Sequence, residues 1–351
     1  MLVDTTFARR GPSGTATYVD CLIGALRESG VEVLEAANER RRPPAGGGLG
    51  SISNLVTDRR WTELELPRHA RRLRPDVLHH PLPASARRAG CPEVVTVHDL
   101  AFLVHPDLFA RSFRAWAARA HRVACRRAGA VVCVSQVTAS ELGRRWAIPR
   151  GRIVVAHHGP GQFCRGAVDE LGSHQSTWTG RARHFLYVGD DEPRKNLDLL
   201  LQAHRLYRER EHERRRASLP LILAGRVARA GPGVELEPEP EPGRLSALYA
   251  EAAALVHPSR YEGFGLTLLE AMAIGAPVVT ADSPGVREVC ADAPLYLEGE
   301  DAGVLAAALE RLSGDGTVRG ELSRRGRARA EAFSWENAAR AHIEAYTLAL
   351  R

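Results

Sequence analysis

The sequence predicts an α/β protein with two domains, each built on a parallel sheet. Short apolar runs alternate with helical patterns along the chain, as expected for parallel α/β layers. The length of 351 residues suits two domains of about 100–200 residues each. Residues 159–182 are rich in Gly, Ser, Gln and Thr and show no periodicity, so they separate two strand–helix series.

The first series begins with a short strand at Leu2–Val3, a Gly-containing turn and a helix from Ala16 to Ser29. Residues 40–50, RRRPPAGGGLG, are expected to form a loop because of their Pro and Gly content. Apolar runs predict the other strands, and apolar residues at helical spacing predict the other helices. These strands are 31–36, 75–80, 94–98, 130–135 and 153–156, and the helices are 113–127 and 137–146.

The second series repeats this pattern. Its expected strands are 185–188, 221–224, 254–257 and 278–280, and its helices are 197–210, 245–252, 266–275 and one near 306–312. Residues 232–243, PGVELEPEPEPG, are expected to hold neither a helix nor a strand interior because Pro recurs. Ser334 is a suitable N-cap for a final amphipathic helix that ends at Leu350. Ligands of such sheets bind outside the carboxyl ends of the strands.

Composition places the chain among ordinary globular proteins. Hydrophobic residues make up 44% and charged residues 26%, which excludes wholesale disorder. No apolar run approaches the roughly 20 residues of a membrane-spanning helix, and the first residues, MLVDTTFARRGPSG, lack a secretory signal pattern. The six cysteines are scattered without a CxxC pair, which argues against a zinc cluster or a disulfide scaffold. We therefore expect a protein of the reducing cytoplasm.

The charge is unevenly divided between the two halves. Residues 1–150 carry 23 Arg and 14 acidic residues, a net +9, and residues 151–351 carry 25 basic and 28 acidic residues, a net −3. This asymmetry indicates that the halves face different partners. Of the 48 basic residues, 47 are Arg, and Lys195 is the only Lys.

The strongest local signal is HPSRYEGFGLTLLEAMAIGAPVV, residues 257–279. An apolar strand ends at His257, a short loop holds Glu262 and Gly263-Phe264-Gly265, and a helix follows. Glycines at a helix start let a ligand approach the backbone, and the free N–H groups there favour phosphate. Glu270 lies in the second turn of that helix. A single Glu is ordinarily a solvated surface residue, but two carboxylates that flank a Gly-rich helix start favour a binding site.

This block resembles the retaining, nucleotide-sugar-dependent glycosyltransferases of family 4 (glycosyltransferase group 1), which have the GT-B fold. Other similar segments follow in the family's order: VTVHDLAFLVHPDLF (95–109), AVVCVSQVTASEL (130–142), YVGDDEPRKNLDLLLQAH (187–204), LILAGR (221–226) and FSWENAA (333–339). The resemblance implies two Rossmann-like parallel-sheet domains facing a central cleft. Residues 1–163 would bind the acceptor and residues 164–334 the nucleotide-sugar donor, with the last helix, about 335–351, packing back on the first domain.

The resemblance also implies roles for single residues. Glu270 would hydrogen-bond the nucleotide ribose, and Glu262 would lie near the donor sugar. Arg194 and Lys195 would pair with the diphosphate, and His98 would lie beside the reacting sugar. Glu262, His98 and Lys195 would form the catalytic group. Further donor contacts would come from Gly225, Arg226, Gly263, Phe264, Gly265 and Leu266, and the acceptor and phosphate loop would contain Gly11 and Gly14.

Physical chemistry agrees with these roles. A leaving diphosphate needs its growing charge stabilised, and both the planar fork of Arg194 and the compact ammonium of Lys195 suit phosphate. Preorganised charge of this kind is usually the largest catalytic contribution. His98 ends an apolar strand, so it either meets the cleft or is a packed core histidine. Residues 190–192, Asp-Asp-Glu, are interpreted as a solvated acidic turn, and we expect no metal site and no cofactor.

The predicted function is transfer of a hexose, of mannose or glucose type, from a GDP- or UDP-linked sugar to an acceptor hydroxyl with retained anomeric configuration. No carboxylate nucleophile is evident in the first domain, which favours same-face displacement, with the leaving phosphate oxygen helping to deprotonate the acceptor. Two alternatives remain open: a nucleotide-sugar-binding pseudoenzyme that scaffolds a glycan-assembly complex, and an epimerase of the GT-B fold.

The expected partners are the nucleotide sugar and a glycan, lipid-linked or small-molecule acceptor in glycan biosynthesis. The basic first half leaves two interpretations open: a peripheral contact with anionic lipids at the inner face of the membrane, and a soluble Arg-rich surface set by genome composition. Its arginines are Arg68, Arg71, Arg72 and Arg74 before a strand and Arg119, Arg122, Arg126 and Arg127 on a helix. Nucleic-acid binding is not expected because these arginines lack interleaved aromatic residues.

Overall fold

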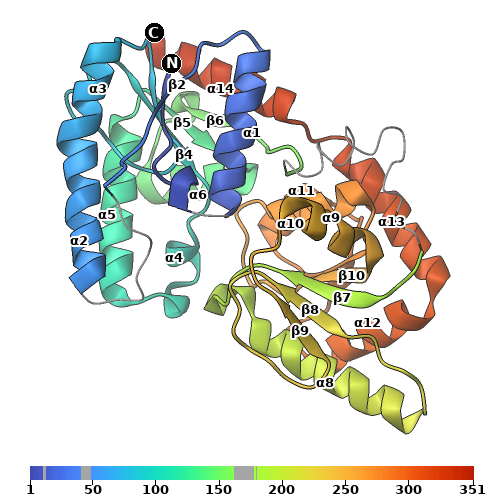
Figure 1. The fold of residues 1–351 in the computed structure, drawn as a ribbon. Coiled ribbons are helices and arrows are strands. Elements are labelled where there is room, and N and C mark those ends of the chain that lie inside the picture. The colour runs from blue at the N-terminus through green and yellow to red at the C-terminus, as the bar shows by residue number, and fades with distance from the viewer. Residues whose placement is uncertain (11–12, 41–48, 162–177, 179) are drawn as a thin grey trace. The chain divides into compact units, whose positions relative to one another are not determined.

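A computed structural model describes the chain apart from residues 11–12, 41–48, 162–177 and 179. The chain forms two compact units (Figure 1). Unit 1 contains Met1–Gly159 and Ser334–Arg351, and unit 2 contains Pro160–Phe333. The structure therefore divides the chain after Gly159, slightly before the position 163 expected from the sequence, and the last helix belongs to unit 1.

Unit 1 is built on a six-stranded parallel sheet with the order β2-β1-β3-β4-β5-β6. The strands are β1 (Leu2–Asp4), β2 (Leu34–Ala36), β3 (Leu78–His80), β4 (Glu93–Val97), β5 (Ala130–Cys133) and β6 (Ile153–Val155). Consecutive valines such as Val94 and Val95 are both fully buried and belong to cores on opposite faces. This is typical of a parallel sheet that is covered on both sides.

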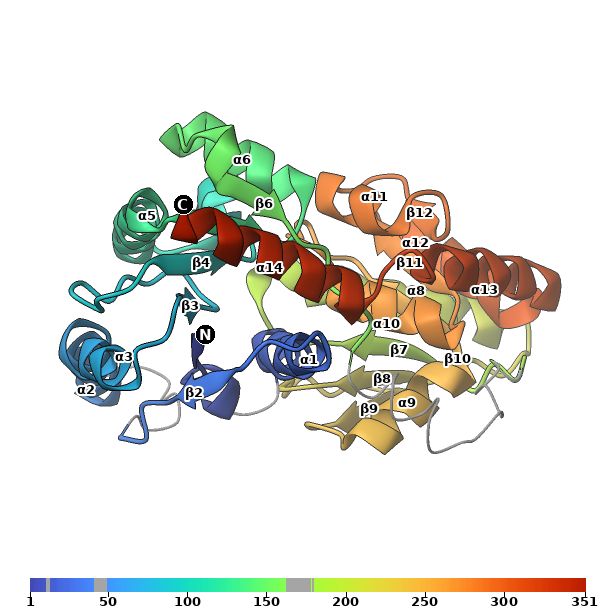
Figure 2. The ribbon, with the colours of Figure 1, turned by 90° about the horizontal axis from the view of Figure 1, so that it is seen from above.

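Helices cover both faces of this sheet. They are α1 (Gly14–Glu28), α2 (Leu49–Arg60), α3 (Leu66–Leu73), α4 (Ala101–Val104), α5 (Arg111–Arg127), α6 (Gln136–Trp146) and α14 (Trp335–Leu350). Helices α1 and α14 share one core with the sheet, and α3, α5 and α6 pack on the other face. Figure 2 shows α14 lying along the sheet of unit 1, where it contacts β4, β5 and β6. The Ser334 hydroxyl caps α14 by accepting from the amide of Asn337, as expected.

Unit 2 has a second six-stranded parallel sheet, with the order β12-β11-β10-β7-β8-β9. The strands are β7 (His184–Val188), β8 (Leu221–Ala224), β9 (Val234–Glu237), β10 (Ala252–His257), β11 (Val278–Ala281) and β12 (Leu295–Leu297). Strand β7 pairs with β10 on one side and β8 on the other, so the order reverses between β7 and β10. In open α/β sheets, ligands bind at the carboxyl ends of the strands beside such a switch point.

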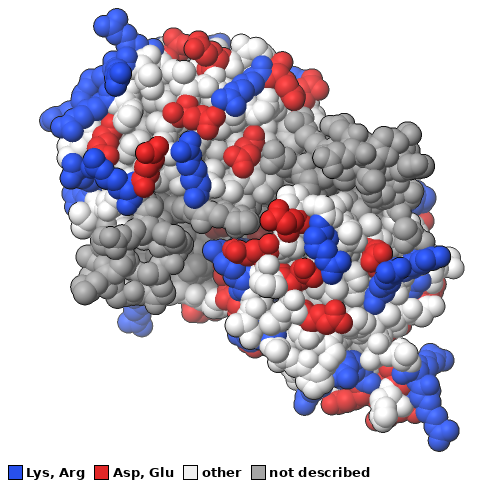
Figure 3. Space-filling model, in the orientation of Figure 1, with Lys and Arg blue, Asp and Glu red and all other residues white. Residues whose placement is uncertain are grey.

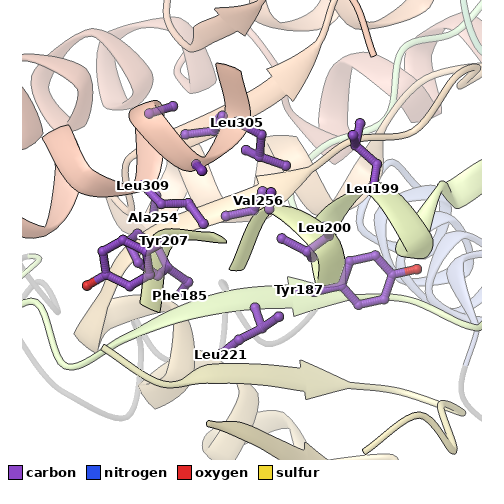
Figure 4. Packing of buried hydrophobic residues seen from close by; sticks show 14 of the residues in the cluster. Phe185, Tyr187, Leu199, Leu200, Tyr207, Leu221, Ala254, Val256, Leu305 and Leu309 are labelled. Atoms are coloured by element: carbon purple, nitrogen blue, oxygen red, sulfur yellow. The ribbon is translucent and has the colours of Figure 1, made fainter. Parts of the chain in front are cut away.

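The helices of unit 2 are α8 (Leu197–Glu213), α9 (Pro242–Glu251), α10 (Leu266–Ile274), α11 (Pro284–Cys290), α12 (Ala302–Gly314) and α13 (Gly316–Ala330). Its largest core joins the sheet to α8 and α12. Figure 4 shows Phe185 of β7 beside Tyr207 of α8, and their ring centroids are 5.5 Å apart in an edge-to-face arrangement. This packing fixes β7, whose carboxyl end leads into the candidate site.

Several elements differ from the sequence expectation. No helix was expected between residues 49 and 73, but this segment forms α2, a π-helical turn at Trp61–Glu65 and α3. Arg68, Arg71 and Arg72 therefore lie on a helix. The local apolar pattern is weak there, and burial of Trp61, whose indole N–H donates to Oδ2 of Asp4 across 3.1 Å, supports the helical run instead.

The Pro-rich segment 232–243 was expected to exclude a strand, and this expectation was wrong. Val234–Glu237 forms strand β9, which pairs with β8 and is the edge strand among those that the structure describes. Its prolines, Pro238 and Pro240, follow the strand, and an edge strand needs no hydrogen bonds on its outer side. Helices α11 and α13 and strand β12 were not predicted either.

Candidate active site

The candidate site begins where β10 ends at His257. The following loop, residues 258–265, leads into α10, and Glu262, Gly263, Phe264 and Gly265 in it are buried. Gly265 has a φ of 89° and directly precedes α10, a left-handed conformation that favours glycine. The loop therefore ends at the N-terminus of α10, which begins at Leu266. The first backbone N–H groups of a helix have no partner within it, so they favour anions.

Glu262 is buried and lies at the centre of an ionic cluster whose cations are partly exposed. Its Oε1 accepts from Nζ of Lys195 across 2.6 Å and from Nε2 of His257 across 3.0 Å, and its Oε2 accepts from Nη1 of Arg194 across 3.2 Å. Arg194 and Lys195 come from the short 3-10 helix Pro193–Lys195 that follows β7. The structure thus brings together Glu262, Arg194 and Lys195 from both sides of the switch point.

The protonation of this cluster follows from its surroundings. Burial alone would raise the pKa of Glu262, but the charges of Lys195 and Arg194 and the hydrogen bond from His257 bring it well below its ordinary value. Burial and the nearby Lys195 lower the pKa of His257. His257 is therefore neutral at pH 7 and carries its proton on Nε2, which faces the carboxylate.

Arg260 ties the two loops together outside the ionic cluster. Its amide donates to the carbonyl of Arg194 across 2.9 Å, and its guanidinium pairs with Glu300 at 2.8 Å. Glu300 also accepts from Nδ2 of Asn196 across 3.2 Å. Backbone and side-chain contacts hold the loop after β10 against the turn after β7, so the cations of the cluster are preorganised.

Glu270 occupies a different environment one helical turn further on. It is buried in α10, and the hydroxyl of Tyr249 on α9 donates to its Oε2 across 3.3 Å. Burial raises the pKa of Glu270 to about 8. A Cβ added at Gly161 would lie 1.9 Å from Oε1 of Glu270, so only glycine lets this stretch of chain approach the carboxyl.

The backbone segments that follow β7 and β8 also approach each other closely. Gly189 and Gly225 have φ values of 149° and 131°, and a Cβ on Gly225 would lie 2.3 Å from the carbonyl oxygen of Gly189. Arg226 pairs with both carboxylate oxygens of Asp190, and this pairing lowers the pKa of Asp190 against the opposing effect of burial. Asp190 is therefore the partner of a guanidinium, where the sequence indicated a solvated acid.

The remaining sequence candidates lie in unit 1. His98 follows β4, and its Nε2 lies 2.9 Å from the carbonyl oxygen of Pro81, so that nitrogen carries the proton. Its ring meets Tyr18 edge to face, and burial lowers its pKa. Gly14 is the exposed first residue of α1. Gly11 lies outside the described residues.

Sequence reasoning missed two features. The first is His257, noted only as the end of a strand; its spacing of five residues from Glu262 was the available signal. The second is a buried hydrogen-bond chain in unit 1, which runs from Tyr346 through His79, Thr96 and Tyr18 to His342. Nδ1 of His342 lies 2.7 Å from the carbonyl of Ala338, so it holds a proton there, and this fixes the donor direction along the whole chain. The chain anchors α14 to unit 1.

Comparisons with known proteins agree with this architecture. Residues 12–159 match the family model of glycosyltransferase family 4, and residues 172–329 match that of glycosyl transferases group 1. The chain is 32% identical over 278 residues to O-antigen chain mannosyltransferase B of Escherichia coli, covering 73% of this chain and 70% of that protein. It is 28% identical over 295 residues to D-inositol 3-phosphate glycosyltransferase of Streptomyces avermitilis, covering 76% and 62%.

Solved structures show the same fold. Sucrose-phosphate synthase of Thermosynechococcus elongatus superposes with a TM-score of 0.71 at 19% identity, covering 99% of this chain and 98% of that one. Anabaena HepE, in complex with UDP and glucose, has a TM-score of 0.66 at 16% identity, covering 98% of each chain. The fold is that of the GT-B glycosyltransferases. The chain belongs to glycosyltransferase family 4 and is a transferase enzyme.

None of the helices in the described parts of the chain has the length and apolar character required to cross a bilayer. Among the residues that the structure describes, no group of three or more His, Cys, Asp or Glu side chains could hold a metal ion.

Proposed function

We propose that the chain transfers a hexose, of mannose or glucose type, from a nucleoside diphosphate sugar to an acceptor hydroxyl with retained configuration. The observation that carries the proposal is the Glu262–Lys195–Arg194 cluster at the switch point of unit 2, beside the N-terminus of α10. Two cations and a helix start at one sheet edge suit a diphosphate. The similarity to a mannosyltransferase supports mannose, carried by GDP, as the first donor to test.

Each residue of the site has a role in this proposal. Lys195 and Arg194 stabilise the charge that grows on the leaving diphosphate, and Glu262 keeps both cations in place before the donor arrives. Glu262 also meets the positive charge that develops on the sugar. Glu270 accepts hydrogen bonds from the nucleotide ribose. His98 of unit 1 contacts the reacting sugar.

The reaction proceeds by same-face displacement. The bond between the anomeric carbon and the diphosphate oxygen breaks, and the acceptor oxygen forms its bond to that carbon from the same face. The acceptor proton passes to the leaving phosphate oxygen. No protein nucleophile and no external oxidant or reductant takes part.

Donor hydrolysis tests the proposal without a known acceptor. The chain is incubated with GDP-mannose, UDP-glucose or UDP-N-acetylglucosamine, and proton NMR follows the anomer released first. We expect one donor to yield its α-sugar, and GDP or UDP alone to raise the melting temperature with concentration. Initial release of the β-anomer would contradict retention. Absence of both hydrolysis and nucleotide stabilisation would contradict the function.

Metal independence belongs to the same proposal. The diphosphate charge is met by Lys195, Arg194 and the start of α10. We therefore expect the same hydrolysis rate in excess EDTA. A complete loss of activity that magnesium or manganese restores would show that a metal shares this role.

A further inference from the structure

Helix α5 of unit 1 has a charge pattern that the transfer reaction does not use. Residues 108–140 contain no Asp or Glu. The six basic residues of this stretch all lie on α5: Arg111, Arg114, Arg119, Arg122, Arg126 and Arg127. Across the described residues, no ion pair is formed by Arg119, Arg122 or Arg126. The helix therefore presents uncompensated positive charge.

Large apolar side chains lie exposed among these arginines. Phe113, Trp116 and Val123 are 44%, 54% and 36% exposed. Phe113 stacks on Phe109 with ring centroids 5.9 Å apart, and its centroid is 6.0 Å from that of Trp116. Helix α5 therefore presents exposed apolar surface and positive charge together. Exposed apolar patches of this kind mark interaction sites.

The arginines also line a hollow on this surface. Arg119, Arg122 and Arg126 lie at helical spacing and border it together with Val123 and Trp146. Three cations around an apolar floor suit an amphipathic group with an anionic head. The opposite side of α5, with Ala117, Ala124 and Cys125, is buried against the sheet, so the exposed side is free for a partner.

Helix α3 extends the same face. It packs on the side of the sheet that α5 covers, and it carries exposed Arg68, Arg71 and Arg72 without an acidic residue. Figure 3 shows Lys and Arg side chains gathered over α3. Helices α5 and α3 thus place exposed arginines on the same side of the sheet of unit 1, and Glu65 lies beside Arg68 and Arg72 of α3.

We propose that the exposed face of α5, supported by α3, binds the surface of a bilayer that contains anionic phospholipids. Trp116, Phe113 and Val123 enter the headgroup region, and Arg119, Arg122 and Arg126 bind lipid phosphates. Charge complementarity with exposed aromatic and aliphatic groups selects an anionic bilayer, where such helices lie in the plane of the interface. Nucleic acid fits less well because Phe109 covers one face of the Phe113 ring.

Vesicle sedimentation of the full chain tests this surface. Phosphatidylcholine vesicles, with and without an equal share of phosphatidylglycerol, are used at low and high salt. We expect binding only to the anionic vesicles, weakened by salt. The triple variant R119Q/R122Q/R126Q should partition on the order of 100-fold less.

The matched control removes the same charge elsewhere. R183Q/R324Q/R340Q replaces three exposed arginines that pair with Glu251, Glu321 and Glu336, and it should partition like the unchanged chain. Equal losses in both triple variants would overturn the assignment to α5, because total charge alone would then explain binding. Absence of salt-sensitive binding to anionic vesicles would overturn the whole proposal. If the chain binds RNA and does not bind these vesicles, the proposal is likewise overturned.

Tryptophan emission gives a second readout. Trp116 is exposed, whereas Trp61, Trp146 and Trp335 are buried, and Trp178 of unit 2 is half-buried with its indole N–H donating to the carbonyl of Ala252. Anionic vesicles should therefore shift the emission of the protein to shorter wavelength, and Trp116→Ser should abolish that shift while circular dichroism stays unchanged. A shift that persists in Trp116→Ser would show that another surface enters the bilayer.

Discussion

The ammonium of Lys195 lies 2.6 Å from Oε1 of Glu262, the same oxygen that accepts a hydrogen bond from the buried His257. A single carboxylate oxygen thus joins a cation from the turn after β7 to a neutral histidine at the end of β10. This relationship defines the polar centre of unit 2. It also distinguishes the two buried carboxyl groups of unit 2, because the neighbouring cations lower the pKa of Glu262, whereas burial raises the pKa of Glu270 to about 8.

The two carboxyl groups should respond differently to mutation. Glu262→Gln removes the charge that holds Lys195 and faces the developing positive charge on the sugar, so kcat should fall on the order of 100-fold with little change in KM for the donor. Glu270→Ala removes hydrogen bonds to the ribose and should raise that KM about 10- to 100-fold. Steady-state kinetics of donor hydrolysis separates the two. Equal effects confined to KM would contradict these roles.

His257 should act as a positioning residue through Glu262. His257→Leu removes a hydrogen bond to an ionised group, and kcat should fall about 10- to 100-fold. His257→Gln retains an N–H donor and should recover part of that loss. The matched control is His184→Leu on β7, since His184 is also buried but donates to the carbonyl of Leu248. A similar loss of kcat in the control, or no recovery with Gln, would indicate a general packing defect.

Donor binding should depend on pH through Glu270. With a pKa of about 8 in the free protein, this carboxyl is protonated at pH 7. Ribose hydroxyls that donate to it favour the ionised form, so nucleotide binding releases a proton. Affinity should therefore rise with pH up to about 8, by at most tenfold per unit, and then level off. Calorimetry with GDP or UDP in two buffers measures the proton release.

The control for this pH dependence is Glu270→Gln, which cannot ionise. Its nucleotide affinity should change little between about pH 6 and pH 8, the range below the raised pKa in which the affinity of the unchanged protein should rise. Proton uptake by the unchanged protein, or the same pH dependence in the variant, would assign the titration to another group.

The repeated strand–helix pattern made most of the fold predictable. Strands such as β5 and β8 are short apolar runs, and their local pattern agrees with their buried positions. The segment that forms α2 and α3 was missed because its helices depend on tertiary burial of Trp61 and Leu66. The edge strand β9 was missed because the prolines that follow it concealed a pairing that needs hydrogen bonds on one side only.

The candidate site was predictable where local sequence carries the chemistry. The Gly-rich helix start and Glu262 stand out within one short segment, and Lys195 stands out as the only lysine. The pairing of Lys195 with Glu262 was not predictable, since it depends on the switch point that brings β7 beside β10. The ion pair between Asp190 and Arg226 likewise joins residues from two different strands.

Selective modification of Lys195 tests the central claim, that the Glu262–Lys195–Arg194 cluster binds the donor diphosphate, most directly. Because Lys195 is the only lysine, an amine-directed reagent has two targets, this side chain and the terminal amine, which mass spectrometry distinguishes. GDP or UDP should protect Lys195 from the reagent and leave the terminal amine reactive. The variant Lys195→Arg should lose most activity although the charge remains, because a guanidinium fork is wider than an ammonium. Labelling of Lys195 that nucleotide does not change, or a fully active Lys195→Arg enzyme, would contradict the claim.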